Sequence, residues 1–173
     1  MLKKNIVLIG MMAAGKSTLG FRLAKKLKYK FIDIDLEIEK NEGQPIISIF
    51  RDKGEEYFRG LEEKISLLFL NKKRSVISLG GGAFINKNIR KKIKKNSYSF
   101  WLNWKIETIL NRIKKKRNRP LALILNDKDL NDLFRKRVKF YKLSDFTVNC
   151  ENKKKSEIVK EISKIIKNEN FID

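Results

Sequence analysis

The hydrophobic and polar positions of this chain form short apolar runs that alternate with longer amphipathic segments. The short runs are typical of buried strands and occupy residues 5–9, 29–32, 75–79, 97–102 and 146–148. Helical spacing of apolar positions is found at residues 18–27, 44–50, 54–69, 106–113, 127–142 and 158–166. The alternation predicts an α/β fold of one domain over residues 1–173, a three-layer sandwich with a central five-stranded parallel sheet.

The stretch from Gly10 to Ser17 reads Gly-Met-Met-Ala-Ala-Gly-Lys-Ser and matches the phosphate-binding pattern G-x-x-x-x-G-K-[ST]. It lies between a predicted strand and a predicted helix, where backbone N–H groups can surround phosphate oxygens at the positive end of the helix dipole. Lys16 is expected to reach the β and γ phosphates, and the Ser17 hydroxyl to bind Mg²⁺. A chance glycine turn is the alternative, but the flanking strand and helix favour a nucleoside triphosphate as the ligand.

Two carboxylates, Asp33 and Asp35, follow the second predicted strand. Ligands of open parallel sheets bind at the carboxyl ends of strands, so this position favours a metal or substrate role. The alternative is that a helix begins here, in which case Asp35 could cap it. The nearby phosphate loop favours the functional interpretation.

Three further segments allow both a structural and a functional interpretation. The glycines at residues 80–82 follow a predicted strand and permit positive φ and close approach to a ligand, but a flexible turn explains them equally well. Arg59 and Glu62 could pair on a solvated helix face. The basic residues 114–121 have the composition of a flap over a phosphate site, although a solvated charge run is also possible.

The net charge of +21 raises the question of a polyanionic partner. The charge is spread along the chain, lysine greatly outnumbers arginine, and the sequence is rich in Asn, Ile and Phe, a mixture typical of AT-rich coding. We therefore favour a diffuse compositional bias over a dedicated polyanion surface and expect no specific nucleic-acid partner. An ATP-dependent nucleic-acid-binding protein is the alternative that the charge suggests.

The rest of the composition restricts the chemical groups available to a site and the expected cellular location of the protein. Cys150 is the only cysteine, which excludes an intramolecular disulfide and a cysteine-based metal site, and histidine is absent. No apolar run approaches the roughly 18 residues of a membrane span, and the first strand leaves no room for a signal peptide. We expect a soluble, cytoplasmic protein without a membrane partner, whose acid–base and metal chemistry uses carboxylates, hydroxyls and lysines.

Considered together, the motifs resemble the shikimate kinase family of small P-loop kinases, from about Lys4 to the final helix. The motifs are the phosphate loop, residues 31–35 with Ile38-Glu39, Gly54-Glu55 with Phe58-Arg59 and Glu62, residues 80–82, Arg119-Pro120-Leu121, and Arg137 four residues before Tyr141. The resemblance implies a P-loop NTPase fold with a mobile lid over about residues 112–125 and a substrate-binding segment over about residues 33–62. It also implies ATP-dependent phosphorylation of a shikimate ring hydroxyl, which gives shikimate 3-phosphate and ADP on the route to chorismate and aromatic amino acids.

The resemblance further implies roles for individual residues. Those expected to bind ATP are Gly10, Met11, Met12, Ala13, Ala14, Gly15, Lys16, Ser17, Thr18, Arg112 and Arg119. Those expected to bind shikimate are Asp35, Arg59, Gly80, Gly81, Gly82 and Arg137. Mg²⁺ would be served by Ser17 and, through water, by Asp33, and catalysis by Lys16, Asp35 and Arg119. ATP and shikimate are the expected small-molecule substrates of a monomeric enzyme.

The chain departs from the family pattern at two places. Ala13 stands where the family usually has glycine, so the backbone there is expected to avoid positive φ. Residues 149–152 match the family's adenine-contacting loop only loosely, and no adenine contacts are assigned to them. A gluconate or nucleotide kinase on the same scaffold is the nearest rival. The discriminator is the set of Asp35, Arg59 and Arg137, which suits a polyhydroxy carboxylate better than a nucleobase.

Overall fold

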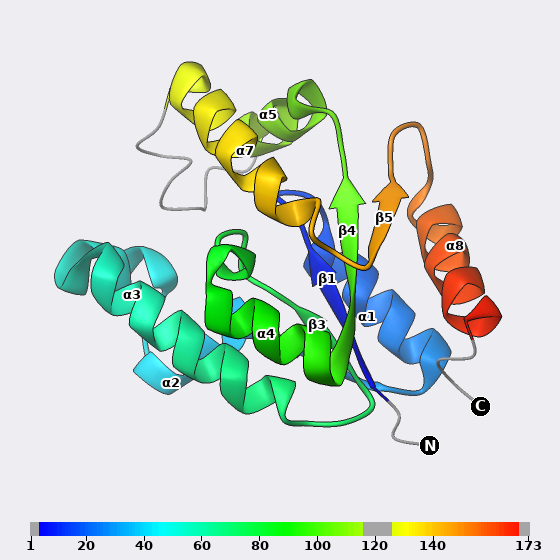
Figure 1. The fold of residues 1–173 in the computed structure, drawn as a ribbon. Helices are drawn as coiled ribbons and strands as arrows, with labels where there is room; N and C mark the ends of the chain where they lie inside the picture. The colour runs from blue at the N-terminus through cyan, green and yellow to red at the C-terminus, as the bar shows by residue number, and fades with distance from the viewer. Residues whose placement is uncertain (1–3, 116–125, 170–173) are drawn as a thin grey trace.

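The computed structural model describes residues 4–115 and 126–169. Its centre is a five-stranded parallel sheet in the order β2-β3-β1-β4-β5 (Figure 1). The strands are β1 (Asn5–Ile9), β2 (Lys30–Asp33), β3 (Ser75–Ser78), β4 (Ser97–Asn103) and β5 (Phe146–Asn149). The predicted α/β fold with a five-stranded parallel sheet is confirmed.

Helices cover both faces of the sheet. In Figure 1, α1 and α8 lie on one face, α2, α3 and α4 lie on the other, and α5 and α7 lie beyond the carboxyl ends of the strands. The helices are α1 (Lys16–Leu27), α2 (Ile34–Glu42), α3 (Ile46–Leu70), α4 (Lys87–Asn96), α5 (Ile106–Lys115), α7 (Asp127–Tyr141) and α8 (Lys155–Asn168), with the short 3-10 helix η1 (Ala83–Ile85). The result is the three-layer arrangement that the alternating pattern predicts.

The central strand β1 explains why the short runs are largely apolar. Its alternating side chains enter two separate cores, Ile6 and Leu8 on the α1 and α8 side, Val7 and Ile9 on the α3 and α4 side. A strand buried on both faces favours apolar residues on both of them, and full burial of each such side chain contributes about 1.5–3 kcal/mol. This rigid layer fixes the loops at its carboxyl edge.

Two helical predictions need correction. Residues 44–50 and 54–69 are predicted as separate helices, but both lie mainly in the single helix α3, and Gly54 introduces a kink there with φ 80° and ψ 173°. Only glycine adopts this conformation readily, so the segment bends without ending. Helix α4 was not predicted at all. Its only buried residues, Ile89 and Ile93, lie among lysines, arginine and asparagines, so its apolar periodicity is short.

Candidate active site

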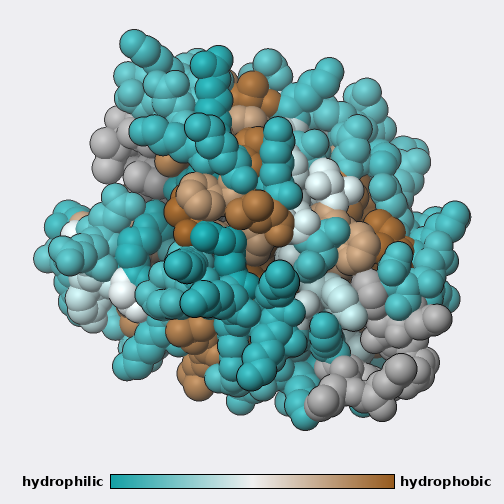
Figure 2. All heavy atoms as spheres, in the orientation of Figure 1, coloured by the Kyte–Doolittle hydropathy of each residue, from teal (hydrophilic) through white to brown (hydrophobic). Residues whose placement is uncertain are grey.

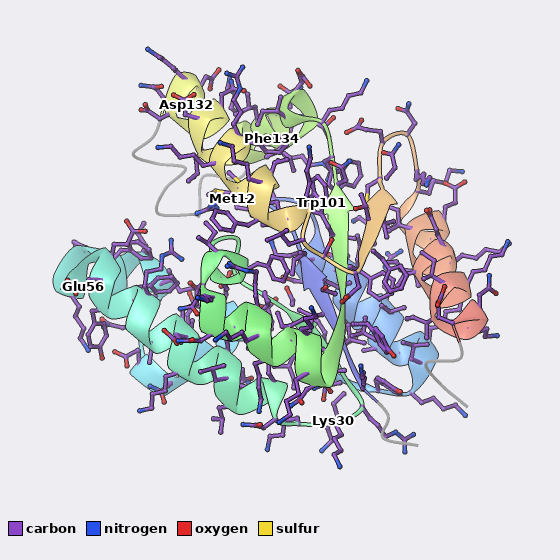
Figure 3. All side chains as sticks on the ribbon, in the orientation of Figure 1. Met12, Lys30, Glu56, Trp101, Asp132 and Phe134 are labelled. Carbon is purple, nitrogen blue, oxygen red and sulfur yellow. The ribbon has the colours of Figure 1, made fainter. Side chains whose placement is uncertain are left out.

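The loops after β1, β2 and β3 meet at the carboxyl edge of the sheet and form a pocket. Its empty volume is about 430 Å³, which includes space open to solvent. Its lining residues are Met12, Asp35, Ile46, Phe50, Phe58, Arg59, Glu62, Gly80, Gly81, Gly82 and Arg137. Figure 3 shows Met12 close to α7, and Figure 2 shows apolar atoms near the middle of the face in view, among largely hydrophilic surroundings. The structure thus brings together all the residues predicted to bind shikimate.

The phosphate loop connects β1 directly to α1. Gly10 and Gly15 have positive φ values of 141° and 87°, and Gly15 is the N-cap of α1. Lys16, the first residue of α1 rather than a loop residue before it, is buried, and its Nζ donates to the carbonyl oxygens of Gly10 and Met11, each at 2.9 Å. Ser17 and Thr18 are exposed in the first turn of α1. The loop therefore presents a helix N-terminus and an ammonium group on one side of the pocket.

The prediction that Ala13 avoids positive φ is wrong, because its φ is 62°. The backbone N–H of Ala14 donates to the carbonyl of Met11 at 3.2 Å, so residues 11–14 form a β-turn with Ala13 at its third position. A type II turn requires positive φ at that position. The methyl group makes this conformation less favourable than for glycine, by about 1–2 kcal/mol.

The two aspartates after β2 have different local roles. Asp33 is buried and is the N-cap of α2, where its Oδ1 accepts a 3.1 Å hydrogen bond from the backbone N–H of Asp35. The cap is therefore Asp33 and not Asp35. Asp35, in the first turn of α2, is half-buried and lines the pocket. Capping by Asp35 is therefore wrong, and a metal or substrate role for the two aspartates stays a prediction.

The three glycines after β3 are needed because side chains of the pocket approach their backbone closely, and not because their φ values are positive. A Cβ atom at Gly80 would overlap Glu62 Oε1 and lie 3.1 Å from Asp35 Oδ1. At Gly81 it would lie 3.1 Å from Arg137 Nη1, and at Gly82 2.6 Å from Arg59 Nη1. Each glycine therefore allows a charged side chain of the pocket to lie against the backbone.

Arg59 and Glu62 pair as their spacing predicts, but not on a solvated face. Arg59 Nη1 donates to Glu62 Oε2 at 2.7 Å, and its Nη2 donates to Glu55 Oε1 at 3.0 Å. The Glu62 side chain is only 3% exposed, and burial raises its pKa although the Arg59 charge opposes the shift. Glu62 was not among the predicted site residues. Its place in the Phe58-Arg59-Glu62 motif was the available signal.

Arg137 is the most deeply buried cation of the pocket, with 3% exposure. Its Nη1 lies 3.6 Å from Met11 Sδ, and its Nε has no hydrogen-bond partner among the described residues. Burial lowers the pKa of Arg137, but a guanidinium group stays protonated at neutral pH. A buried cation with an unsatisfied donor is suited to an anionic ligand.

Tyr141 connects two parts of this pocket and was not predicted as a site residue. Its hydroxyl donates to the carbonyl oxygen of Gly81. Burial raises the pKa of Tyr141 to about 12, while the Arg137 charge acts in the opposite direction. The phenol therefore stays neutral and fixes α7 against the glycine segment.

An apolar wall completes the pocket. Phe50 and Phe58 come from α3 on either side of the Gly54 kink, and their ring centroids lie 4.5 Å apart. Ile46 and Met12 extend this surface. From the sequence, Phe58 was identified only as part of the Phe58-Arg59 motif, because helical periodicity cannot distinguish a core residue from a residue of a pocket wall. The pocket offers an apolar surface to a ring, with carboxylates and guanidinium groups around it.

The remaining predicted residues lie outside the pocket or outside the described ranges. Arg112 is stacked on Trp104, with its guanidinium carbon 3.7 Å from the ring centroid, and lies beside the phosphate loop. Arg119 and most of the predicted lid at residues 112–125 lie outside the described residues. In residues 149–152, Glu151 accepts hydrogen bonds from Lys105 N and Thr108 Oγ1 at 2.8 and 3.2 Å.

The donors near the loop are compatible with Mg²⁺. The Ser17 hydroxyl and the Asp33 carboxylate provide oxygen atoms, which this ion prefers, and Mg²⁺ commonly uses few protein ligands together with phosphates and water. Across residues 4–115 and 126–169, no group of three or more Asp, Glu, Cys or His side chains could hold a metal ion. These donors fit a magnesium ion that arrives with a nucleotide better than a metal held by the protein alone.

A phosphate loop at the edge of a parallel sheet, next to a pocket for a small anionic ring compound, defines a P-loop kinase with a small-molecule substrate. The model of the shikimate kinase family matches residues 12–167. Shikimate kinase of Persephonella marina is 45% identical over 159 residues, which cover 92% of this chain and 96% of that protein. The chain therefore belongs to the shikimate kinase family.

Solved structures agree with this assignment. The structure of shikimate kinase from Acinetobacter baumannii in complex with shikimate has a TM-score of 0.90 and 31% identity, covering 96% of this chain and 94% of that one. Shikimate kinase from Aquifex aeolicus has a TM-score of 0.85 and 37% identity, covering 96% and 98%. Among the described residues, no helix is long and apolar enough to cross a membrane.

Proposed function

We propose that this enzyme transfers the γ-phosphoryl group of ATP to a ring hydroxyl of shikimate, giving shikimate 3-phosphate and ADP. The observation that supports this proposal is that the phosphate loop and the pocket share a boundary. Met12 belongs to the phosphate loop and also lines the pocket with Asp35, Arg59 and Arg137. A substrate in the pocket would thus lie beside the phosphates of a nucleotide bound by the loop.

The two arginines are proposed to bind the shikimate carboxylate. Arg137 supports this role because its buried Nε has no partner among the described residues. Arg59 is held in place by Glu55 and Glu62, which leaves its orientation fixed before substrate arrives. Planar guanidinium groups bind carboxylates through paired hydrogen bonds, which gives both affinity and orientation. The ring would then pack on Phe50 and Phe58.

Asp35 is proposed to orient the attacking hydroxyl and to accept its proton late in the transfer. Its carboxylate lies close to the Gly80 backbone at the carboxyl edge of the sheet, a rigid position that favours in-line alignment. Lys16 would neutralise the charge that develops on the transferring phosphoryl group. Glu62 is not proposed as the base, because Arg59 already pairs with it.

Ser17 and, through water, Asp33 are proposed to hold Mg²⁺. When bound, the ion neutralises charge on the β and γ phosphates. Arg119, which lies outside the described residues, is proposed to contact phosphate and substrate, and residues 33–62 are proposed to form the substrate-binding segment of one domain. A monomeric, cytoplasmic enzyme remains our prediction.

A coupled assay with MgATP and a panel of acceptors tests the proposed function. Shikimate should be phosphorylated with a kcat/KM at least about a hundredfold above those of quinate and gluconate, because a hydrogen-bonding pocket discriminates strongly against ligands that leave its groups unpaired. Preferred turnover of gluconate or of a nucleoside monophosphate would show that the acceptor has been assigned wrongly.

A further inference from the structure

Two side chains of the β4–α5 region contact the outside of the phosphate loop. Trp104, the residue directly after β4, is buried, and its Nε1 donates a 3.0 Å hydrogen bond to the carbonyl oxygen of Ala14. Arg112 of α5 lies on the face of that indole, 3.7 Å from the ring centroid, and its Nη1 is 3.5 Å from the carbonyl oxygen of Ala13. Sequence reasoning assigned no role to Trp104.

The two carbonyl groups belong to the part of the loop where the backbone is least favourable. Ala13 has a φ of 62° and is one of four non-glycine residues with positive φ among those described. A side chain with a Cβ atom disfavours this conformation, which persists only where surrounding contacts impose it. The longer contact from Arg112 reaches the carbonyl group of Ala13 itself. The hydrogen bond from Trp104 reaches the carbonyl group of the next residue, Ala14.

The direction of the Trp104 bond also matters for phosphate binding. All described peptide bonds are trans, and the C=O and N–H of a trans peptide point in opposite directions. Holding the Ala14 carbonyl toward Trp104 therefore turns the N–H of Gly15 away from it. Backbone N–H groups are the phosphate ligands of such loops, so this bond orients one of them.

We propose that Trp104 is a positioning residue for the nucleotide: its indole N–H holds the phosphate loop in the conformation that Ala13 disfavours, and its ring supports Arg112 against the same loop. The proposal rests on the proposed function only in taking an adenine nucleotide as the ligand. The competing explanation is that Trp104 simply fills the core around α1, α5 and α8. The two explanations differ in whether the effect of Trp104 depends on the residue at position 13.

A double-mutant cycle tests this dependence. Trp104→Phe keeps an aromatic ring but removes the N–H donor, and Ala13→Gly removes the methyl group that disfavours positive φ. Binding of MgADP is measured by calorimetry for the full-length wild type, both single variants and the double variant, together with melting temperatures without nucleotide and KM values for both substrates. Ile109→Val, which removes one methylene group from the same core cluster, controls for lost packing.

In the wild-type background, Trp104→Phe should raise the Kd for MgADP about three- to tenfold, the effect of losing one useful hydrogen bond. The KM for ATP should rise in parallel, and the KM for shikimate should change less than about twofold. In the Ala13→Gly background, the same substitution should change the Kd for MgADP less than about twofold, because glycine adopts the turn unaided. Ile109→Val should leave this Kd unchanged in either background.

Two results would overturn the proposal. An equal increase of the MgADP Kd in both backgrounds would mean that Trp104 does not act through Ala13. A lower melting temperature with unchanged nucleotide affinity would make Trp104 a core residue only. Because MgADP binding requires no shikimate, a wild type that failed to phosphorylate shikimate would refute the proposed function without affecting this cycle.

Discussion

Among single residues, the balance of charge decides which ligand the pocket can hold. Arg59 is paired with Glu55 and Glu62, so its charge is largely compensated before a ligand arrives. Arg137 is almost fully buried and retains an unsatisfied Nε among the described residues. The unsatisfied Nε donor of this buried guanidinium group therefore favours an anionic substrate such as a carboxylate.

Replacing Arg59 or Arg137 by lysine should affect the acidic substrate selectively. Lysine keeps the positive charge but loses the planar fork, so the KM for shikimate should rise at least about tenfold while the KM for ATP changes less than about threefold. Steady-state kinetics with each substrate varied in turn measure both values. Arg135→Lys on the exposed face of α7 is the matched control. Equal increases in both KM values would show that these arginines do not act on the acceptor.

The titration of Glu62 should make the stability of the folded protein depend on pH, and the sign of this dependence can be predicted. Burial raises the pKa of Glu62 above the ordinary range of a glutamate, so the folded state binds the Glu62 proton more tightly than the unfolded state does. The associated stability is fully present below the unfolded pKa and is lost as pH rises through the folded pKa. Glu62→Gln lacks this titration. Its melting temperature relative to wild type should therefore increase from about pH 4 toward pH 7.

Thermal melts of the wild type and Glu62→Gln across this pH range measure that difference. Glu56→Gln, at an exposed position of the same helix, should show no comparable trend. A melting-temperature difference that stays constant or decreases with pH would contradict the raised pKa.

At the level of strands and helices, the backbone of the glycine segment after β3 packs directly against the charged side chains of the pocket. A methyl group at Gly80 would overlap Glu62 Oε1 and approach Asp35, so Gly80→Ala should reduce kcat/KM for shikimate at least about tenfold. Gly60→Ala on α3 is the control, because nothing lies within 4 Å of the added Cβ. It should leave activity unchanged and stabilise the helix by up to about 1 kcal/mol. Full activity of Gly80→Ala would contradict the close packing described here.

The strands and the main motifs could be predicted because their signals are local. Short apolar runs identify strands buried on both faces, and the phosphate loop is defined by consecutive residues. Helix α4 was missed because it buries only Ile89 and Ile93. The roles of Tyr141 and Trp104 could not be predicted, since each depends on a contact with a segment distant in the sequence. The pairing of Glu62 with Arg59 follows from their spacing, but the burial of Glu62 in the pocket does not. Ala13 was predicted wrongly because the turn around it overrides the residue's own preference.

For the molecule as a whole, the positive charge is placed unevenly. No Asp or Glu occurs in residues 1–32 or 64–106. These segments place Lys28, Lys30, Lys72, Lys73, Arg74, Lys94 and Lys95 near the starts of β2, β3 and β4. Figure 3 shows Lys30 at this end of the sheet, opposite Met12. Helix C-termini also lie there, and their negative dipole ends favour cations without requiring a partner.

We therefore expect only weak, salt-sensitive binding of nucleic acid. Duplex DNA should bind at low salt and dissociate as the salt concentration approaches about 0.15 M, because screening and counterion competition remove a sequence-independent attraction. Gel-shift titrations at several salt concentrations measure this, and Lys72→Glu with Lys73→Glu should weaken the low-salt binding without changing kinase activity. Sequence-selective binding below about 1 μM at about 0.15 M salt would contradict a purely diffuse interaction.

The turnover of Asp35→Asn tests the central claim, that the pocket holds the acceptor hydroxyl in line with a nucleotide on the phosphate loop. The substitution is nearly isosteric but removes the proton acceptor, so kcat should fall by about a hundredfold or more. Affinity for MgADP and melting temperature should remain close to wild type, because Asp33 and not Asp35 caps α2. A variant that turns over shikimate at the wild-type rate would contradict this placement of the reaction, whatever its stability.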